Sequence, residues 1–208
     1  MASLKLNGDT SGTVTLTVPA VAGTNTLTLP AVTDTLVGLA ATQTLTNKII
    51  QGGAITSATA QASTSGTSID FTSIPSWVKR ITVMLSEVSS SGTSNYLIRL
   101  GDSGGFETTG YNVYSARFSS TSLAGSVFSD GFGIPSGAAS NSLNGLIIFT
   151  NISGNTWVAS GNFGDRVGIN GYLTAGGKTL SDILTQVRIV TANGTDTFDA
   201  GTINIMYE

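Results

Sequence analysis

The sequence predicts an all-β protein in two parts, an extended N-terminal β-stem followed by a jelly-roll-like β-sandwich head. Three observations predict this class. An 11-residue repeat near the N-terminus alternates threonine with aliphatic residues, which is the period of a strand with one buried face. The second half of the chain holds many short apolar segments separated by Gly, Ser, Asn and Asp. Charged residues make up only 10% of the chain, against ~25% in typical globular proteins, and 26 of the 208 residues are glycine.

The repeat contains the predicted strands of the stem. Thr15–Val21 (TLTVPAV) returns 11 residues later as Thr26–Val32 (TLTLPAV). Thr and Val favour strands, and Pro19 and Pro30 would interrupt a helix, so each copy is predicted to be a short strand that proline ends. Two short strands are marginally stable in water. We therefore expect this segment to need partners, and identical copies from sister chains would serve.

Composition divides the chain into three regions. Residues 1–53 contain the repeat and no aromatic residue, and they are predicted to form the stem or anchor. Residues 54–67 are small and polar, which predicts a linker. Residues 68–208 contain all 8 Phe, 5 Tyr and 2 Trp of the chain. This last region is predicted to form the head, because it carries the large apolar side chains that a core requires.

The head is expected to consist of short strands with one buried face. Ile81, Val83 and Leu85 would share a face of one strand, and the last strand is expected to belong to the sheet. Thr179–Leu184 is the one segment that suggests a helical turn, with an irregular arm as the alternative. The predicted strands are Ser68–Phe71, Val78–Val88, Tyr96–Leu100, Tyr111–Phe118, Val127–Phe132, Leu146–Asn151, Thr156–Asn162, Val187–Thr191 and Gly201–Tyr207.

Charge and residue types argue against several function classes. The net charge is −3 and the nine Lys and Arg residues are dispersed, so neither nucleic acid nor an anionic membrane is an expected partner. No apolar run approaches the ~20 residues of a membrane span, and no secretory signal is recognised after Met1. The chain has no His and no Cys, the commonest general base and the main ligands of structural zinc. We therefore predict a protein that is not an enzyme and has no cofactor and no metal.

One string imitates a catalytic motif. Gly101–Gly105 spells GDSGG, the signature around the nucleophile of serine proteases. That chemistry requires a histidine to take the serine proton, and this chain has none to serve Ser103. The string is instead predicted to be a glycine-rich turn after the strand that ends at Leu100.

Two acid pairs and three aromatic residues are candidates for binding. Asp102 with Glu107, and Asp196 with Asp199, could hydrolyse a glycosidic bond or bind Ca²⁺, but neither pair has a recognisable ligand spacing. Turn capping is the expected role of these acids. The aromatic candidates could stack on the sugar rings of a host ligand, with core packing as the alternative. They are Tyr111, Tyr114 and Trp157.

Several strings resemble bacteriophage fibre proteins. LNGDTSG (6–12), TLTLPA (26–31) and TLTNKII (44–50) are similar to the thin stems of tail-fibre and virion-fibre proteins. The second half resembles the terminal domain of many phage tail-fibre-like proteins. The strings that carry this second resemblance are Ile74–Val83, Gly101–Gly105 with Gly110-Tyr111, and Gly194–Gly201.

The resemblance implies a homotrimer that is located on the virion and contacts the host surface. Its stem would bind other virion proteins, of the tail or of the capsid, and its head would bind a host glycan or protein. The resemblance implies no catalytic residues. The residues expected in the virion anchor and trimer stem are Leu16, Val18, Pro19, Leu27, Leu29 and Pro30.

Three functions follow as hypotheses. The first is a structural and adhesive tail fibre, whose weak contacts to the host are strengthened by multivalency. The second is a capsid decoration or head-fibre protein, whose N-terminal strands grip the shell. The third is a polysaccharide depolymerase, but the long parallel β-helix that usually serves that role would not fit in this chain.

Overall fold

The computed structural model describes residues 3–7, 11–17, 21 and 55–208. The chain divides into two compact units, residues 1–49 and residues 50–208. The described residues form three sheets in which every paired strand is antiparallel. They contain no helix, and so none that is long and apolar enough to cross a membrane.

The N-terminal unit contains one two-stranded sheet in its described part. Strand β1 (Ser3–Asn7) pairs with β2 (Thr13–Thr17), so that Leu4 lies opposite Leu16. Strand β2 includes the first residues of the first repeat copy. Its partner β1 is a segment for which no strand was predicted. The second repeat copy and most of the expected anchor residues lie outside the described residues, namely Val18, Pro19, Leu27, Leu29 and Pro30.

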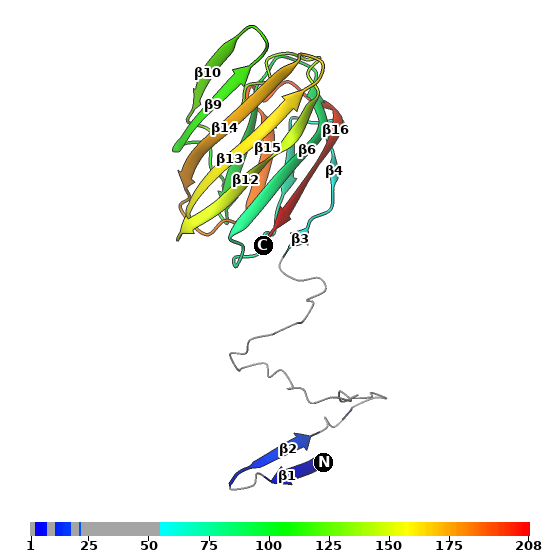
Figure 1. Ribbon diagram of the computed structural model, residues 1–208, viewed down its shortest axis with the longest axis vertical. Helices are drawn as coiled ribbons and strands as arrows, with labels where there is room; N and C mark the ends of the chain where they lie inside the picture. The colour runs from blue at the N-terminus through cyan, green and yellow to red at the C-terminus, as the bar shows by residue number, and fades with distance from the viewer. Residues whose placement is uncertain (1–2, 8–10, 18–20, 22–54) are drawn as a thin grey trace. The chain divides into compact units, whose positions relative to one another are not determined.

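The C-terminal unit is built from two sheets (Figure 1). In spatial order, the larger sheet consists of β10 (Leu123–Phe128), β9 (Tyr111–Phe118), β14 (Asn170–Thr179), β13 (Thr156–Asp165), β12 (Leu143–Ser153), β6 (Arg80–Ser90), β16 (Phe198–Tyr207) and β3 (Thr56–Ser57), with β4 (Gln61–Ala62) also on β16. The smaller sheet consists of β11 (Phe132–Ile134), β7 (Tyr96–Asp102), β15 (Gln186–Thr191) and β5 (Ser68–Phe71), with β8 (Gly105–Phe106) also on β7.

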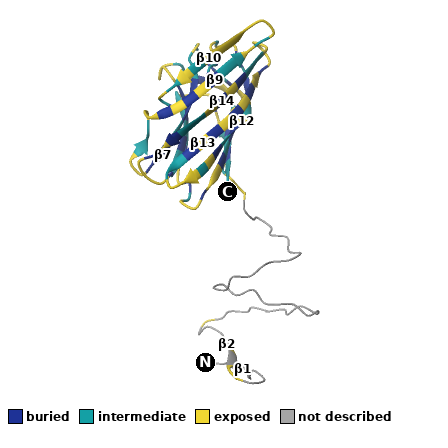
Figure 2. Ribbon diagram, turned by 60° about the vertical axis from the view of Figure 1, so that its left-hand side comes forward, coloured by how far each residue is buried: buried dark blue, intermediate teal, exposed yellow. Residues whose placement is uncertain are grey.

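The inner faces of the two sheets share one hydrophobic core. Alternation along the strands produces it: Ile81, Val83 and Leu85 on β6 are all buried, as predicted, and the residues between them are not. Figure 2 shows buried and exposed residues alternating along β13 and β14. At the centre, Phe132 meets Phe149 edge to face, with ring centroids 5.0 Å apart. The prediction of an all-β fold is therefore confirmed, and the arrangement is that of a β-sandwich.

One strand prediction was wrong, and one long strand was not predicted. The predicted strand Val127–Phe132 is divided between β10 and β11, which belong to different sheets. No strand was predicted for β14, whose Gly176 and Gly177 are residues typical of turns. Glycine is required at position 176 by close packing: a Cβ there would lie 2.4 Å from the carbonyl oxygen of Asn112 on β9. The segment 180–185 that follows β14 is irregular.

The segment predicted as a linker contributes to the larger sheet. Strands β3 and β4 lie within residues 54–67, and both pair with β16. The Ser63 hydroxyl is buried and donates to the carbonyl oxygen of Ala200 at 2.9 Å. Residues 56–63 therefore cover an edge of β16, and the described sandwich begins before Ser68.

Candidate interaction surface

Five neighbouring strands of the larger sheet present an outer face that has no charged side chain. Residues that lie opposite each other in antiparallel strands point to the same side, so the outward positions form rows across the sheet. From β10 to β12, the rows are Leu123, Phe118, Gly171, Gly164 and Asn144; Gly125, Ala116, Leu173, Asn162 and Leu146; Val127, Tyr114, Ala175, Ser160 and Ile148; and, starting on β9, Asn112, Gly177, Val158 and Thr150.

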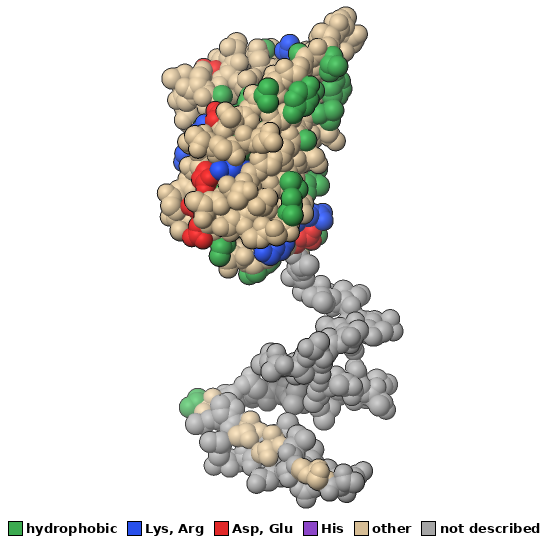
Figure 3. Space-filling model, turned by 90° about the vertical axis from the view of Figure 1, so that its left-hand side faces the viewer, with side chains coloured by type: hydrophobic (Ala, Val, Ile, Leu, Met, Phe, Trp, Pro, Cys, Tyr) green, Lys and Arg blue, Asp and Glu red, His purple; other side chains and the backbone are tan. Residues whose placement is uncertain are grey.

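Large apolar side chains on this outer face are open to solvent. Leu123 is 77% exposed, Val127 is 81% exposed and Tyr114 is 59% exposed. Figure 3 shows hydrophobic side chains gathered along the right-hand side of the sandwich, with most charged side chains at its left and its base. A sandwich sheet normally presents polar residues to water on its outer face. Contiguous apolar exposure of this kind marks an interaction surface.

The smaller sheet, in contrast, carries charged side chains. Arg188 on β15 makes two hydrogen bonds of 2.7 Å to the carboxylate of Asp70 on β5, and its guanidinium lies 4.1 Å from the centroid of the Phe106 ring. Arg99 on β7 lies 3.5 Å from the carboxylate of Asp130. The scarcity of charge in the whole chain therefore does not account for the uncharged face, because charges are placed on the other sheet.

The three aromatic residues predicted to contact a ligand are not brought together at one surface. Tyr111 is 5% exposed and Trp157 is 3% exposed, so both rings belong to the core and are closed to a sugar. Only Tyr114 lies on the outer face. The alternation along the strands indicates this burial. Tyr111 lies two residues from buried Val113 and therefore on the same face of its strand, and Trp157 lies two residues from buried Ala159.

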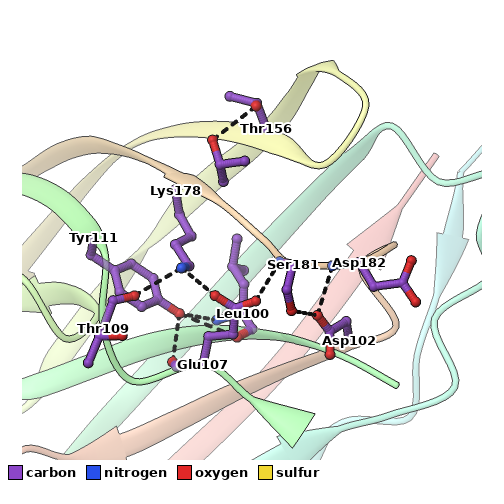
Figure 4. Close-up of polar contacts among 10 residues, drawn as sticks. Leu100, Asp102, Glu107, Thr109, Tyr111, Thr156, Lys178, Ser181 and Asp182 are labelled. Atoms are coloured by element: carbon purple, nitrogen blue, oxygen red, sulfur yellow. Dashed lines mark hydrogen bonds and ion pairs between the residues drawn. The ribbon is translucent and has the colours of Figure 1, made fainter. Parts of the chain in front are cut away.

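The GDSGG string forms the turn between β7 and β8, as predicted, and its aspartate is fixed in a polar network (Figure 4). The Asp102 carboxylate accepts hydrogen bonds from the Ser181 hydroxyl at 2.7 Å and from the N–H groups of Gly104 and Asp182. The hydrogen bond from Ser181 is the main cause that holds the pKa of Asp102 below its ordinary value. This carboxylate clamps the turn to the irregular segment after β14.

A buried lysine continues this network. Lys178 on β14 forms an ion pair with Glu107 and donates to the carbonyl oxygen of Thr109 at 2.9 Å. Burial opposes ionisation of Glu107, but Lys178 and the Ser181 N–H group outweigh it and lower the pKa of Glu107. Figure 4 shows how these side chains converge from β14 and from the loop after β8. The groups satisfy one another, and the network has the features of a structural one.

The remaining candidate residues also make hydrogen bonds to groups within the protein. Ser103 donates to Asp182 at 3.5 Å, which is too long for efficient proton transfer. Asp196 accepts the N–H group of Ser94 at 2.9 Å, and Asp199 accepts the Ser89 hydroxyl. Across the part of the chain that the structure describes, no three acids, His or Cys lie close enough to hold a metal ion.

A hollow of about 720 Å³ opens at one end of the outer face. Its lining includes Gly164 and Gly171, which lie opposite each other on β13 and β14, and the Phe118 ring lies over Gly171. This end is formed by the last residues of β9 and β13 and the first residues of β12 and β14, away from the end where β3 pairs with the C-terminal residues of β16. The remaining lining residues are Phe118, Asn144, Asp165, Arg166, Ile169 and Asn170.

No protein-family model, no curated protein and no solved structure matches this chain. The function is therefore inferred from the uncharged outer face and from the resemblance of the short strings in the sequence.

Proposed function

We propose that this protein is a structural virion fibre of a bacteriophage, a homotrimer that joins other virion proteins through residues 1–53 and presents its sandwich for attachment to the host. The observation that supports this proposal best is the uncharged outer face. A partner that covers this face must itself bring few charges, because a charge buried against it would lose its hydration without gaining a counter-ion. The same face on a sister chain meets that requirement.

The N-terminal unit supports the same proposal. A sheet of two short strands is marginal alone, and the described part of this unit holds only β1 and β2. Association of three chains would supply the missing strands. A trimer would also present three copies of each head surface at once, so that weak contacts to a host glycan or protein act together.

We infer a role in binding, not in catalysis. The acids that might have served a hydrolase are engaged by the protein's own N–H groups, hydroxyls and Lys178. This arrangement gives them a structural role and supports no proton-transfer chemistry at Ser103.

Sedimentation equilibrium of the full chain tests the trimer. We expect a mass of about three times 21.2 kDa. Immunogold labelling of intact particles then tests the location. Label on the tail supports a tail fibre, whereas label distributed over the capsid supports the alternative, a decoration or head-fibre protein. A monomer at all concentrations, or release of reducing ends from host polysaccharide, would contradict the proposal.

A further inference from the structure

The outer face carries a ridge and a hollow in the same cross-strand row. Leu123 on β10 lies opposite Phe118 on β9, and Phe118 lies opposite Gly171 on β14. The row continues through Gly164 on β13 to Asn144 on β12. Its first two positions carry large side chains, and the next two carry none. The Phe118 ring lies over Gly171, where an added Cβ would be 2.3 Å from it, so the face is raised from β10 to β14 and lowered at Gly164 on β13.

The ridge is an edge that lacks the usual protection. Strand β10 lies at the end of the larger sheet, and its sequence LAGSVF has neither a charge nor a proline. Leu123 and Val127 are its most exposed large side chains. Natural edge strands are normally protected by charges, by proline or by a covering segment. At the other side of this sheet, β3 and β4 cover β16, whereas none of the described residues covers β10.

The hollow has the chemistry to receive such a hairpin. A Cβ at Gly164 would have no atom within 4 Å, so the floor is open. The Asp165 carboxylate is already occupied by three backbone N–H groups. The rim offers the amides of Asn144 and Asn170 and the guanidinium of Arg166. These donors suit the hydroxyls and carbonyl oxygens of a serine-rich turn, and the turn of the β9–β10 hairpin is Ser-Ser-Thr-Ser, residues 119–122.

We propose that the hollow of one copy receives the β9–β10 hairpin of the next copy, with Leu123 seated over Gly164. The inference rests on the proposed homotrimer and assigns its contact in the head. In the proposed trimer each copy offers its hairpin to the next copy and its hollow to the copy before it, so the contact is heterologous.

Engineered cysteines test this contact, since the chain has no cysteine of its own. Leu123 and Gly164 lie three strand spacings apart in one copy, roughly 14 Å, which is beyond the reach of a disulfide. In the double variant Leu123→Cys/Gly164→Cys, oxidation should give covalent trimers on a non-reducing denaturing gel. Each single variant should give none. The matched control is Leu123→Cys/Thr150→Cys, whose second thiol lies on the same face but about 20 Å along β12 from the row that contains Gly164. This control should also give no covalent trimer.

A second variant tests the hollow by filling it. Gly164→Leu has room for its side chain in the isolated copy, so the stability of the dissociated chain should hold while the trimer dissociates at a higher protein concentration than the wild type. If the wild type is trimeric and the cysteine pair does not cross-link, this contact is wrong and the proposed function stands. If the wild type is a monomer, both fail. A Gly164→Leu trimer that assembles normally but no longer binds host cells would assign the hollow to a host ligand, and would overturn the contact.

Discussion

The hydroxyl of Ser181, just after β14, donates to the carboxylate of Asp102 at the end of β7 across 2.7 Å. The two residues are far apart in the chain, and their contact joins the larger sheet to the smaller one. The Gln186 side chain adds a hydrogen bond of 2.6 Å to the carbonyl oxygen of Asp102. The acid of the GDSGG string is thus a structural clamp at the turn between β7 and β8.

Replacing this carboxylate should make the sandwich less stable in a pH-dependent way. The pKa of Asp102 is lower in the folded protein than its ordinary value, mainly because of Ser181. Its contribution is therefore present above the unfolded pKa of about 3.9 and is lost as the pH falls through the folded pKa. Asp102→Asn should cost ~1–3 kcal/mol near neutral pH. Urea unfolding at neutral and acidic pH should show the difference between variant and wild type shrinking in acid. A difference that does not change with pH would contradict the role of the charge.

The Tyr111 hydroxyl completes the backbone hydrogen bonding of β7. It accepts the N–H group of Leu100 at 2.9 Å and donates to the carbonyl oxygen of Glu107 at 3.0 Å, and burial raises the pKa of this tyrosine. Tyr111→Phe leaves a buried N–H group without a partner and should cost ~1–3 kcal/mol of unfolding free energy. Tyr114→Phe is the matched control, because that ring is exposed, and it should change stability by less than ~0.5 kcal/mol. Equal effects of the two variants in urea unfolding would show that the hydrogen bonds of Tyr111 contribute nothing.

The ion pair of Lys178 and Glu107 should behave as a coupled unit. Lys178→Met removes the cation and leaves a largely buried carboxylate, which should cost ~1–3 kcal/mol, less than in a dry core because Glu107 retains some solvent. Glu107→Gln alone leaves the buried ammonium of Lys178 without its counter-ion and should have a similar cost. The double variant should cost less than the sum of the two single costs, by ~1 kcal/mol. A thermodynamic cycle from urea unfolding measures this, and strictly additive costs would contradict the coupling.

The alternation of side chains predicted the sandwich and most of its buried faces, but it did not predict the surface on which the proposals rest. The outward residues of β9 (Asn112, Tyr114, Ala116 and Phe118) have no charge, and this is legible in the sequence. These residues form an uncharged surface only because the strands on either side of β9 also have uncharged outward residues. Strand β10 follows β9 closely in the chain, whereas β14 comes some 50 residues later, and only the register shows that its outward residues are also uncharged.

Three further strands carried no usable signal in the sequence. A strand of two residues, such as β3 or β4, is too short to show alternation. Strand β14 contains Gly176 because β9 packs closely there, and such a glycine is indistinguishable from a turn glycine in a single sequence. The hollow also depends on the register, which places Gly164 opposite Gly171 across two strands.

Truncation of the N-terminus separates the role of the stem from that of the sandwich. A chain that begins at Ile55 keeps β3 and β4 and should fold with the full stability of the sandwich. A chain that begins at Ser68 loses the backbone hydrogen bonds from Ala58 to Ile205 and from Ser63 to Gly201, both 2.9 Å long, and exposes an edge of β16. With each bond worth ~1 kcal/mol, it should unfold at a lower urea concentration and scatter more light on heating. Both truncated chains lack residues 1–53, so neither should be incorporated into phage particles, whereas the full chain should be. If the chain from Ile55 is incorporated as well as the full chain, residues 1–53 are not the anchor, and the repeat that begins at Thr15 must serve another purpose.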